Sequence, residues 1–119
     1  MRDHNNLRAF KLADELVIEI YRISKYFPKE EIYGLTSQIR RAAVSVPSNI
    51  VEACARESQK EYHRFLEIAF ASLREAHYQF ILAIRLGFIG EDDSSAFKNK
   101  FEEAEKVLGS LVRKMRSTK

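Results

Sequence analysis

Residues 33–56 read YGLTSQIRRAAVSVPSNIVEACAR, a stretch with the apolar spacing of a buried helix and a proline near its middle. A proline in a helix interior lacks an amide hydrogen and crowds the carbonyl four residues earlier, at a cost of about 3 kcal/mol. Serine and asparagine side chains can hydrogen-bond the backbone groups that are freed. The stretch therefore predicts one helix, kinked at its proline and stabilised there by a structural polar cluster of Ser45, Pro47, Ser48, Asn49 and Glu52. The alternative is that Pro47 ends one helix and Ser48 caps another.

Apolar residues recur in alternating steps of three and four along four segments, which is the spacing of helices that bury one face. Ser58 and Glu61 have the spacing of a capping box, and Gly87 suits a left-handed helix end. The pattern predicts helices over residues 9–26, 35–56 and 58–87, and a last helix whose apolar stripe runs over residues 97–115. Acidic residues 91–93 at its beginning and basic residues at its end match the helix dipole. With short connections, such helices pack as an antiparallel up-down-up-down four-helix bundle, so we expect an all-α fold and a single domain over residues 1–119.

The composition agrees with a compact helical protein. Apolar residues make up 45% of the 119 residues and charged residues 31%, with only four glycines and two prolines. The single cysteine, Cys54, excludes an internal disulfide and is expected to be a buried, inert thiol in a reducing compartment. Without a signal-peptide pattern or an apolar run of roughly 20 residues, the chain is expected to be cytoplasmic with no membrane partner.

The sequence lacks the residue patterns of common catalytic and metal sites. His63 and His77 would lie about 21 Å apart along one helix, too far to share a metal ion. No Glu-x-x-His pair and no glycine-rich phosphate loop occurs. We therefore expect no enzyme activity, no catalytic residues, no metal and no cofactor.

Basic residues form two groups along the sequence. Arg40 and Arg41 are adjacent, so both cannot face the core, and Arg56, Lys60 and Arg64 are spaced four apart. These five residues could form a groove for phosphate groups, although the net charge of only +3 means that several copies of the patch would be needed for firm binding. The alternatives are a solvated surface pair at 40–41 and internal ion pairs, favoured for Arg56, with Glu52, Glu57, Glu61 or Glu67.

The third predicted helix carries more apolar residues than one bundle face needs. Besides its main stripe it has Ile68 and four residues expected at an oligomer interface, namely Phe65, Phe70, Ile81 and Phe88. Either the other helices cover these side chains or a second copy of the chain does, and large exposed aromatic patches favour the second copy.

Several motifs carry a family resemblance: FPK at 27–29, YGLTSQIRRAA at 33–43, SVPSNI at 45–50, Glu52, Arg56, RFL at 64–66, IA at 68–69 and SL at 72–73. From Phe10 to Leu111 the chain resembles the bacterial four-helix-bundle family encoded in intervening sequences of large-subunit ribosomal RNA genes, once labelled ribosomal protein S23. It differs at Ala53 and Ala71, where the family usually has glycine. Alanine is acceptable in a helix at both positions.

The resemblance implies a homo-oligomer, which in similar proteins is a pentameric barrel. A relative, the accessory variability protein of diversity-generating retroelements, is similar in fold and binds nucleic acid and its reverse transcriptase through a basic surface. Two functions are therefore expected: a non-enzymatic homo-oligomer that binds structured RNA, or a scaffold that assembles or tethers another protein without direct nucleic-acid binding. Salt dependence of RNA affinity separates them.

Overall fold

The computed structural model describes residues 2–117, with side chains described for residues 2–114. Four α-helices form the protein: α1 (Arg8–Ser24), α2 (Leu35–Cys54), α3 (Gln59–Arg85) and α4 (Glu91–Ser117). Two short 3₁₀ turns, η1 (His4–Asn6) and η2 (Lys29–Glu31), precede α1 and α2. The described part contains no strand, so the predicted all-α class is confirmed.

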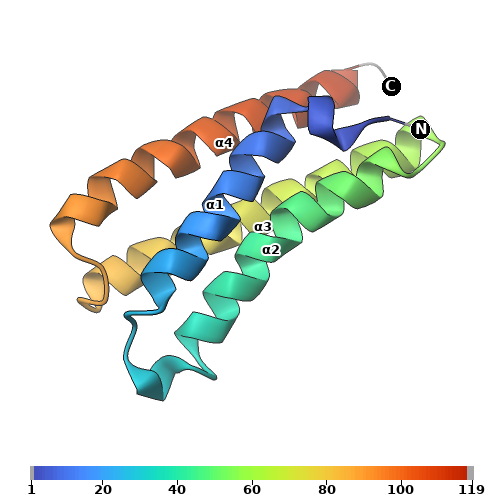
Figure 1. Cartoon of the computed structure of the whole chain (residues 1–119). Coiled ribbons are helices and arrows are strands. Elements are labelled where there is room, and N and C mark those ends of the chain that lie inside the picture. Colours follow the sequence, from blue (N-terminus) through green and yellow to red (C-terminus); the bar gives the residue numbers. More distant parts are fainter. Residues whose placement is uncertain (1, 118–119) are drawn as a thin grey trace.

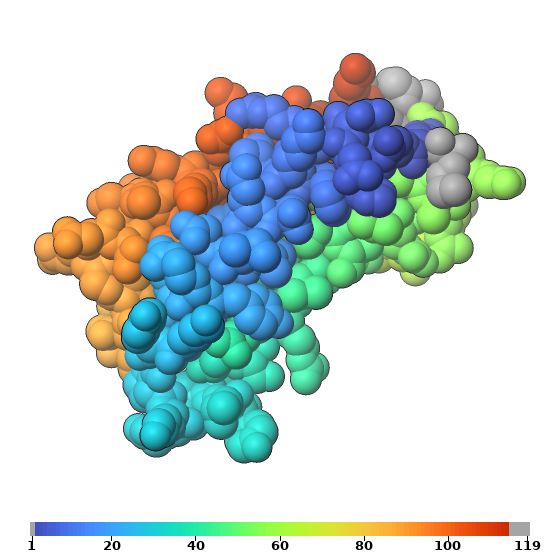
Figure 2. All heavy atoms as spheres, viewed as in Figure 1, coloured from blue at the N-terminus to red at the C-terminus, as the bar shows by residue number. Residues whose placement is uncertain are grey.

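Each helix packs against its neighbours in the chain, and α4 packs back against α1 (Figure 1). The start of α1 and the end of α4 lie at the same end of the bundle as the α2–α3 connection, and the other two connections lie at the opposite end. This is the up-down-up-down four-helix bundle predicted above. In Figure 2 the α1–α2 connection, in cyan, projects beyond the rest of the surface.

Helix α2 continues through Pro47, so the prediction of one helix is confirmed and the alternative of two helices is wrong. The bend angle at Pro47 stays a prediction. The first free amide of the helix is satisfied from outside, because the Glu31 carboxylate accepts a hydrogen bond of 2.9 Å from the Leu35 N–H. This cap comes from η2, and Gly34 itself provides none.

Both ends of α3 form as the sequence predicts. The Ser58 hydroxyl accepts a hydrogen bond of 3.1 Å from the Glu61 N–H, as in a capping box. At the other end Gly87 adopts φ 81°. The N–H groups of Gly87 and Phe88 donate to the carbonyls of Ile84 and Ala83, the two bonds of a Schellman motif.

As predicted, the acidic residues 91–93 lie at the beginning of α4, where they form its first turn and the helix dipole favours them. Its apolar face completes a core centred on three aromatic rings, with Phe80 lying 5.3 Å from Phe97 and 5.2 Å from Phe101 between ring centres. Gly109 allows α4 to approach α3 closely, since a Cβ there would lie 3.1 Å from the ring of Phe70.

Candidate nucleic-acid interface

The two adjacent arginines of α2 have different surroundings. Arg40 is half-buried: its Nε donates a hydrogen bond of 2.8 Å to the Ser24 hydroxyl, and its guanidinium lies over the Tyr21 ring at 4.7 Å. Arg41 is exposed and has no ion-pair partner among the described residues. Arg40 is therefore held in place by α1, while the charge of Arg41 is not neutralised.

Two hollows open beside Arg41, one toward α1 and one toward α3. The first, about 380 Å³, is lined by Tyr21, Arg40 and the aliphatic Val44 and Ile32, together with Thr36, Ser37 and Arg41. The second, about 350 Å³, is lined by Tyr33, Ser37, Gln38, Arg41 and Glu75. We call this surface the Arg41 notch, defined by Tyr21, Tyr33, Ser37, Arg40 and Arg41. It presents hydroxyls, guanidinium groups and aromatic rings together.

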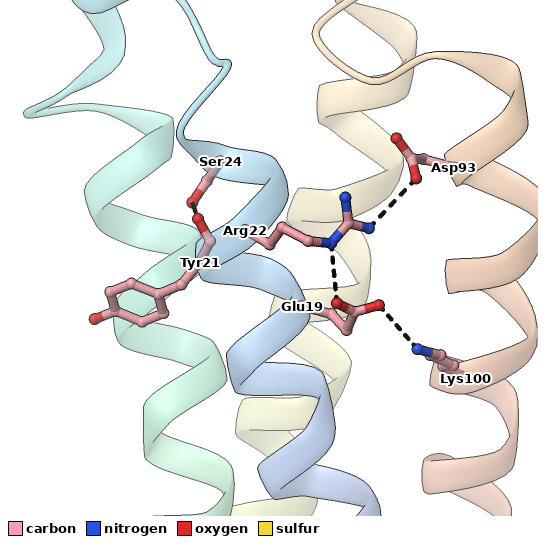
Figure 3. A network of polar contacts seen from close by, with 6 residues as sticks. All are labelled: Glu19, Tyr21, Arg22, Ser24, Asp93 and Lys100. Atoms are coloured by element: carbon pink, nitrogen blue, oxygen red, sulfur yellow. Dashed lines mark hydrogen bonds and ion pairs between the residues drawn. The ribbon is translucent and has the colours of Figure 1, made fainter.

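Charged side chains behind the notch hold α1 to α4 (Figure 3). Glu19 accepts hydrogen bonds of 3.0 Å from both Arg22 and Lys100, and Arg22 also reaches Asp93 at 3.4 Å. Tyr21 points away from this network, toward α2. The hydrogen bond from Arg22, and after it the one from Lys100, lowers the pKa of the Glu19 carboxyl below its ordinary value. The network therefore links α1 to α4 on the side of α1 away from the Tyr21 ring.

The remaining predicted basic residues, Arg56, Lys60 and Arg64, form a second group at the other end of α2; we call it the Arg56 group. About 20 Å of helix separates Arg41 from the end of α2 at Cys54, so the five residues do not make one continuous cluster. Arg56 pairs with Glu52, and the guanidinium of Arg64 lies 3.6 Å from the Glu61 carboxylate.

Both arginines of the Arg56 group also stack on one ring. Phe65 lies under Arg56 at 4.8 Å and under Arg64 at 5.3 Å. Lys60 is exposed and makes no ion pair in the part of the chain that the structure describes. The two arginines therefore serve packing and internal pairing, while Lys60 faces solvent.

Part of the predicted polar cluster forms at Pro47. The Asn49 amide donates 2.8 Å to the Ser45 carbonyl and 3.0 Å to the Ser45 hydroxyl, which lies 2.8 Å from the Ser72 hydroxyl of α3. Pro47 is buried, Ser48 is exposed, and Glu52 bonds to Arg56. The bonds join α2 to α3 on the N-terminal side of the proline.

Three of the four residues predicted at an oligomer interface pack against the core of the same chain, and the fourth is exposed. Phe65, Phe70 and Phe88 are half-buried against the core of the same chain, with Phe88 lying 5.6 Å from Phe27. Ile81, 42% exposed, and Ile68, 36% exposed, remain open on α3. Side chains of the same chain therefore cover part of the apolar excess and leave the two isoleucines at the surface.

The described residues include two pairs of a histidine and a carboxylate, His63 with Glu67 at 3.6 Å and His77 with Glu105 at 2.8 Å. No group of three or more His, Cys, Asp or Glu side chains lies close enough there to hold a metal ion. Cys54 is buried, and burial raises the pKa of its thiol, which lowers its reactivity at neutral pH. No helix between residues 2 and 117 has the length and apolar character needed to cross a bilayer.

Sequence reasoning missed the partners that make up the notch. Tyr21 and Ser24 lie on another helix from Arg40, and Tyr33, 94% exposed, stands in the α1–α2 connection. The sequence shows Tyr33 eight residues before Arg41, but helical spacing does not relate the two, because α2 begins at Leu35.

These features define a small all-α bundle protein whose surface carries two groups of basic residues. The chain matches the family described as 23S rRNA-intervening sequence protein over residues 5–110 and belongs to this family. It is similar to the crystal structure of a protein of unknown function from the S23 ribosomal protein family of Bacteroides thetaiotaomicron, with 25% identity and a TM-score of 0.80. That match covers 88% of this chain and 95% of the other. No curated protein matches the chain.

Proposed function

We propose that this protein is a non-enzymatic homo-oligomer that binds structured RNA through a basic surface repeated around the assembly. The observation that carries the proposal is Arg41, an exposed guanidinium between two hollows with no carboxylate at ion-pair distance among the described residues. An uncompensated arginine of this kind is suited to phosphate groups, which it can contact through two parallel hydrogen bonds.

The other predicted contacts contribute unequally. Arg40 flanks Arg41 and Lys60 is exposed, so both can add to the attraction of a polyanion. Arg56 and Arg64 would first have to release Glu52 and Glu61. We therefore assign the main role in RNA binding to Arg40, Arg41 and Lys60.

Assembly is the second part of the proposal. A net charge of +3 per chain gives weak attraction alone, but several copies of one patch can engage one RNA at a high effective concentration. The exposed Ile68, Ile81 and Tyr78 of α3 supply apolar surface for contacts between copies. Light scattering at micromolar concentration tests this step. A mass of 13.8 kDa, that of one chain, would contradict it.

Charge reversal tests RNA binding. The double variant Arg41→Glu/Lys60→Glu should lose salt-sensitive binding to an RNA hairpin while its helicity and its mass by light scattering stay unchanged. Retained binding would reject the basic surface, and loss of folding would show that these positions are structural. Wild-type protein with little affinity at any salt concentration would favour the protein-interaction scaffold.

A further inference from the structure

We infer that the Arg41 notch takes unpaired nucleotides of RNA, with a base stacking on Tyr33 and phosphate groups at Arg41, while the Arg40 guanidinium covers a face of the Tyr21 ring. The inference rests on the proposed RNA-binding function and specifies which part of an RNA the surface holds. Phosphate contacts alone do not distinguish duplex from single strand, whereas stacking on a protein ring requires a base that has left its own stack.

Two tyrosine rings lie beside Arg41. Tyr33 is 94% exposed and Tyr21 is 41% exposed, and each lines one of the two hollows beside Arg41. The hollows measure about 380 and 350 Å³ and are open to solvent. Rings placed beside a basic side chain are the usual platform for single-stranded nucleic acid, because every base has a flat face.

The Arg41 notch carries two guanidinium groups, those of Arg40 and Arg41. Arg40 is oriented by the Ser24 hydroxyl and the Tyr21 ring, neither of which neutralises it. Glu31 accepts from the Leu35 N–H and Glu75 accepts from the Gln79 amide at 3.2 Å, but a bond from a neutral N–H does not cancel the charge of a carboxylate. Glu75 lines the second hollow, whereas no carboxylate of the described residues lines the first. Two guanidinium groups beside two rings favour a polyanion with flat bases over a protein segment.

The Arg41 notch includes a residue of the connection between α1 and α2. The α1–α2 connection that carries Tyr33 projects from the body of the molecule, as Figure 2 shows. A projecting ring can reach a base in an RNA loop while the rest of the bundle stays clear of the adjoining stem. This geometry suits hairpin loops and bulges.

The test compares two RNA probes: a hairpin with an unpaired loop, and a blunt duplex made from the same stem. Wild-type protein should prefer the hairpin. Tyr33→Ala should weaken hairpin binding by roughly tenfold, the effect of losing one stacked base, and leave duplex binding unchanged. Tyr33→Phe should keep the preference, because the ring is retained. Tyr26→Ala is the matched control, since Tyr26 is 81% exposed and lines neither hollow.

A second measurement reports stacking directly. A fluorescent adenine analogue placed in the hairpin loop should change its emission on binding wild-type protein or Tyr33→Phe, but not on binding Tyr33→Ala. Because Tyr33 is almost fully exposed, its replacement should leave helicity unchanged. The salt dependence of hairpin binding should also be the same in Tyr33→Ala, since no charge is removed.

The outcomes separate the inference from the proposed function. Salt-sensitive binding with equal affinity for hairpin and duplex, unaffected by Tyr33→Ala, would overturn the inference and keep the function. No RNA binding by wild-type protein would overturn both. A lower mass of Tyr33→Ala in light scattering would assign the notch to contacts between copies and would also overturn the inference.

Discussion

Arg41 and Arg64 are both exposed arginines on helices that pack against each other, but only Arg64 has a carboxylate at ion-pair distance among the described residues. Arg64 also lies over Phe65, a ring that it shares with Arg56. Arg41 instead stands between two hollows. The difference shows that the charge available to a ligand depends on what each side chain already contacts, and not on how many basic residues a segment carries.

The largest expected effect comes from reversing the charge of Arg41, and the same change at Arg64 serves as the comparison. Arg41→Glu should weaken binding of an RNA hairpin by roughly tenfold or more and reduce its salt dependence, because a phosphate contact is replaced by repulsion. Arg64→Glu should change RNA affinity by less than about threefold, since Glu61 already balances Arg64. Filter binding over a range of salt concentrations measures both. Equal losses in the two variants would contradict the distinction between the notch and the Arg56 group.

The sequence predicts those parts of the fold that depend on contacts between residues close together in the chain. The apolar stripes determine which face of each helix is buried, and Ile20, Ile39, Leu66 and Leu108 are all at most 1% exposed. The capping bond of Ser58 and the left-handed Gly87 follow from residues a few positions apart. These parts of the fold could be predicted because they need only periodicity and short-range chemistry.

The surroundings of the basic residues could be identified only from the tertiary structure. The pairing of Arg56 with Glu52 was one alternative on the sequence, because the two lie one helical turn apart. The bond from Arg40 to Ser24 joins two helices across the α1–α2 connection, and the ring of Tyr21 is positioned by the same packing. Helical spacing alone does not show which side chains of different helices face each other.

Asn49 lies on α2 between the Arg41 notch and the Arg56 group, and its hydrogen bonds are expected to stabilise this part of the helix. Asn49→Ala should lower the free energy of unfolding by roughly 1 to 3 kcal/mol, because the Ser45 carbonyl and hydroxyl lose a donor beside Pro47. Ser48→Ala is the matched control: Ser48 is exposed, and its replacement should stay within about 0.5 kcal/mol. Urea denaturation followed by circular dichroism gives both values. Equal stability of the two variants would show that the Asn49 bonds contribute nothing.

A smaller effect is expected where α3 begins, next to Lys60 and Arg64. Ser58→Ala removes the hydroxyl that accepts from the Glu61 N–H and should cost about 1 kcal/mol of stability. RNA binding at the Arg41 notch should not change, because the first turn of α3 lies at the far end of α2. Thermal unfolding and hairpin affinity, measured on the same samples, test the two statements. A large loss of RNA affinity would mean that Arg56 and Arg64 contribute more than their ion pairs with Glu52 and Glu61 suggest.

The smallest expected effect concerns Glu19, a carboxylate that pairs with Arg22 of α1 and Lys100 of α4. Because Arg22 and Lys100 lower its pKa in the folded protein, Glu19 adds stability above its ordinary pKa of 4.5, and this contribution is lost as the pH falls through the lowered value. Lys100→Ala should reduce the free energy of unfolding by about 0.5 kcal/mol near neutral pH, the size typical of a partly exposed pair. At a pH below the lowered pKa, where the carboxyl is protonated, the variant and the wild type should converge. Lys98→Ala, which removes an exposed lysine of α4 that makes no ion pair in the described residues, should match the wild type at both pH values. If the Lys100→Ala difference persisted unchanged in acid, the contribution of Lys100 would come from packing and not from the charge of Glu19.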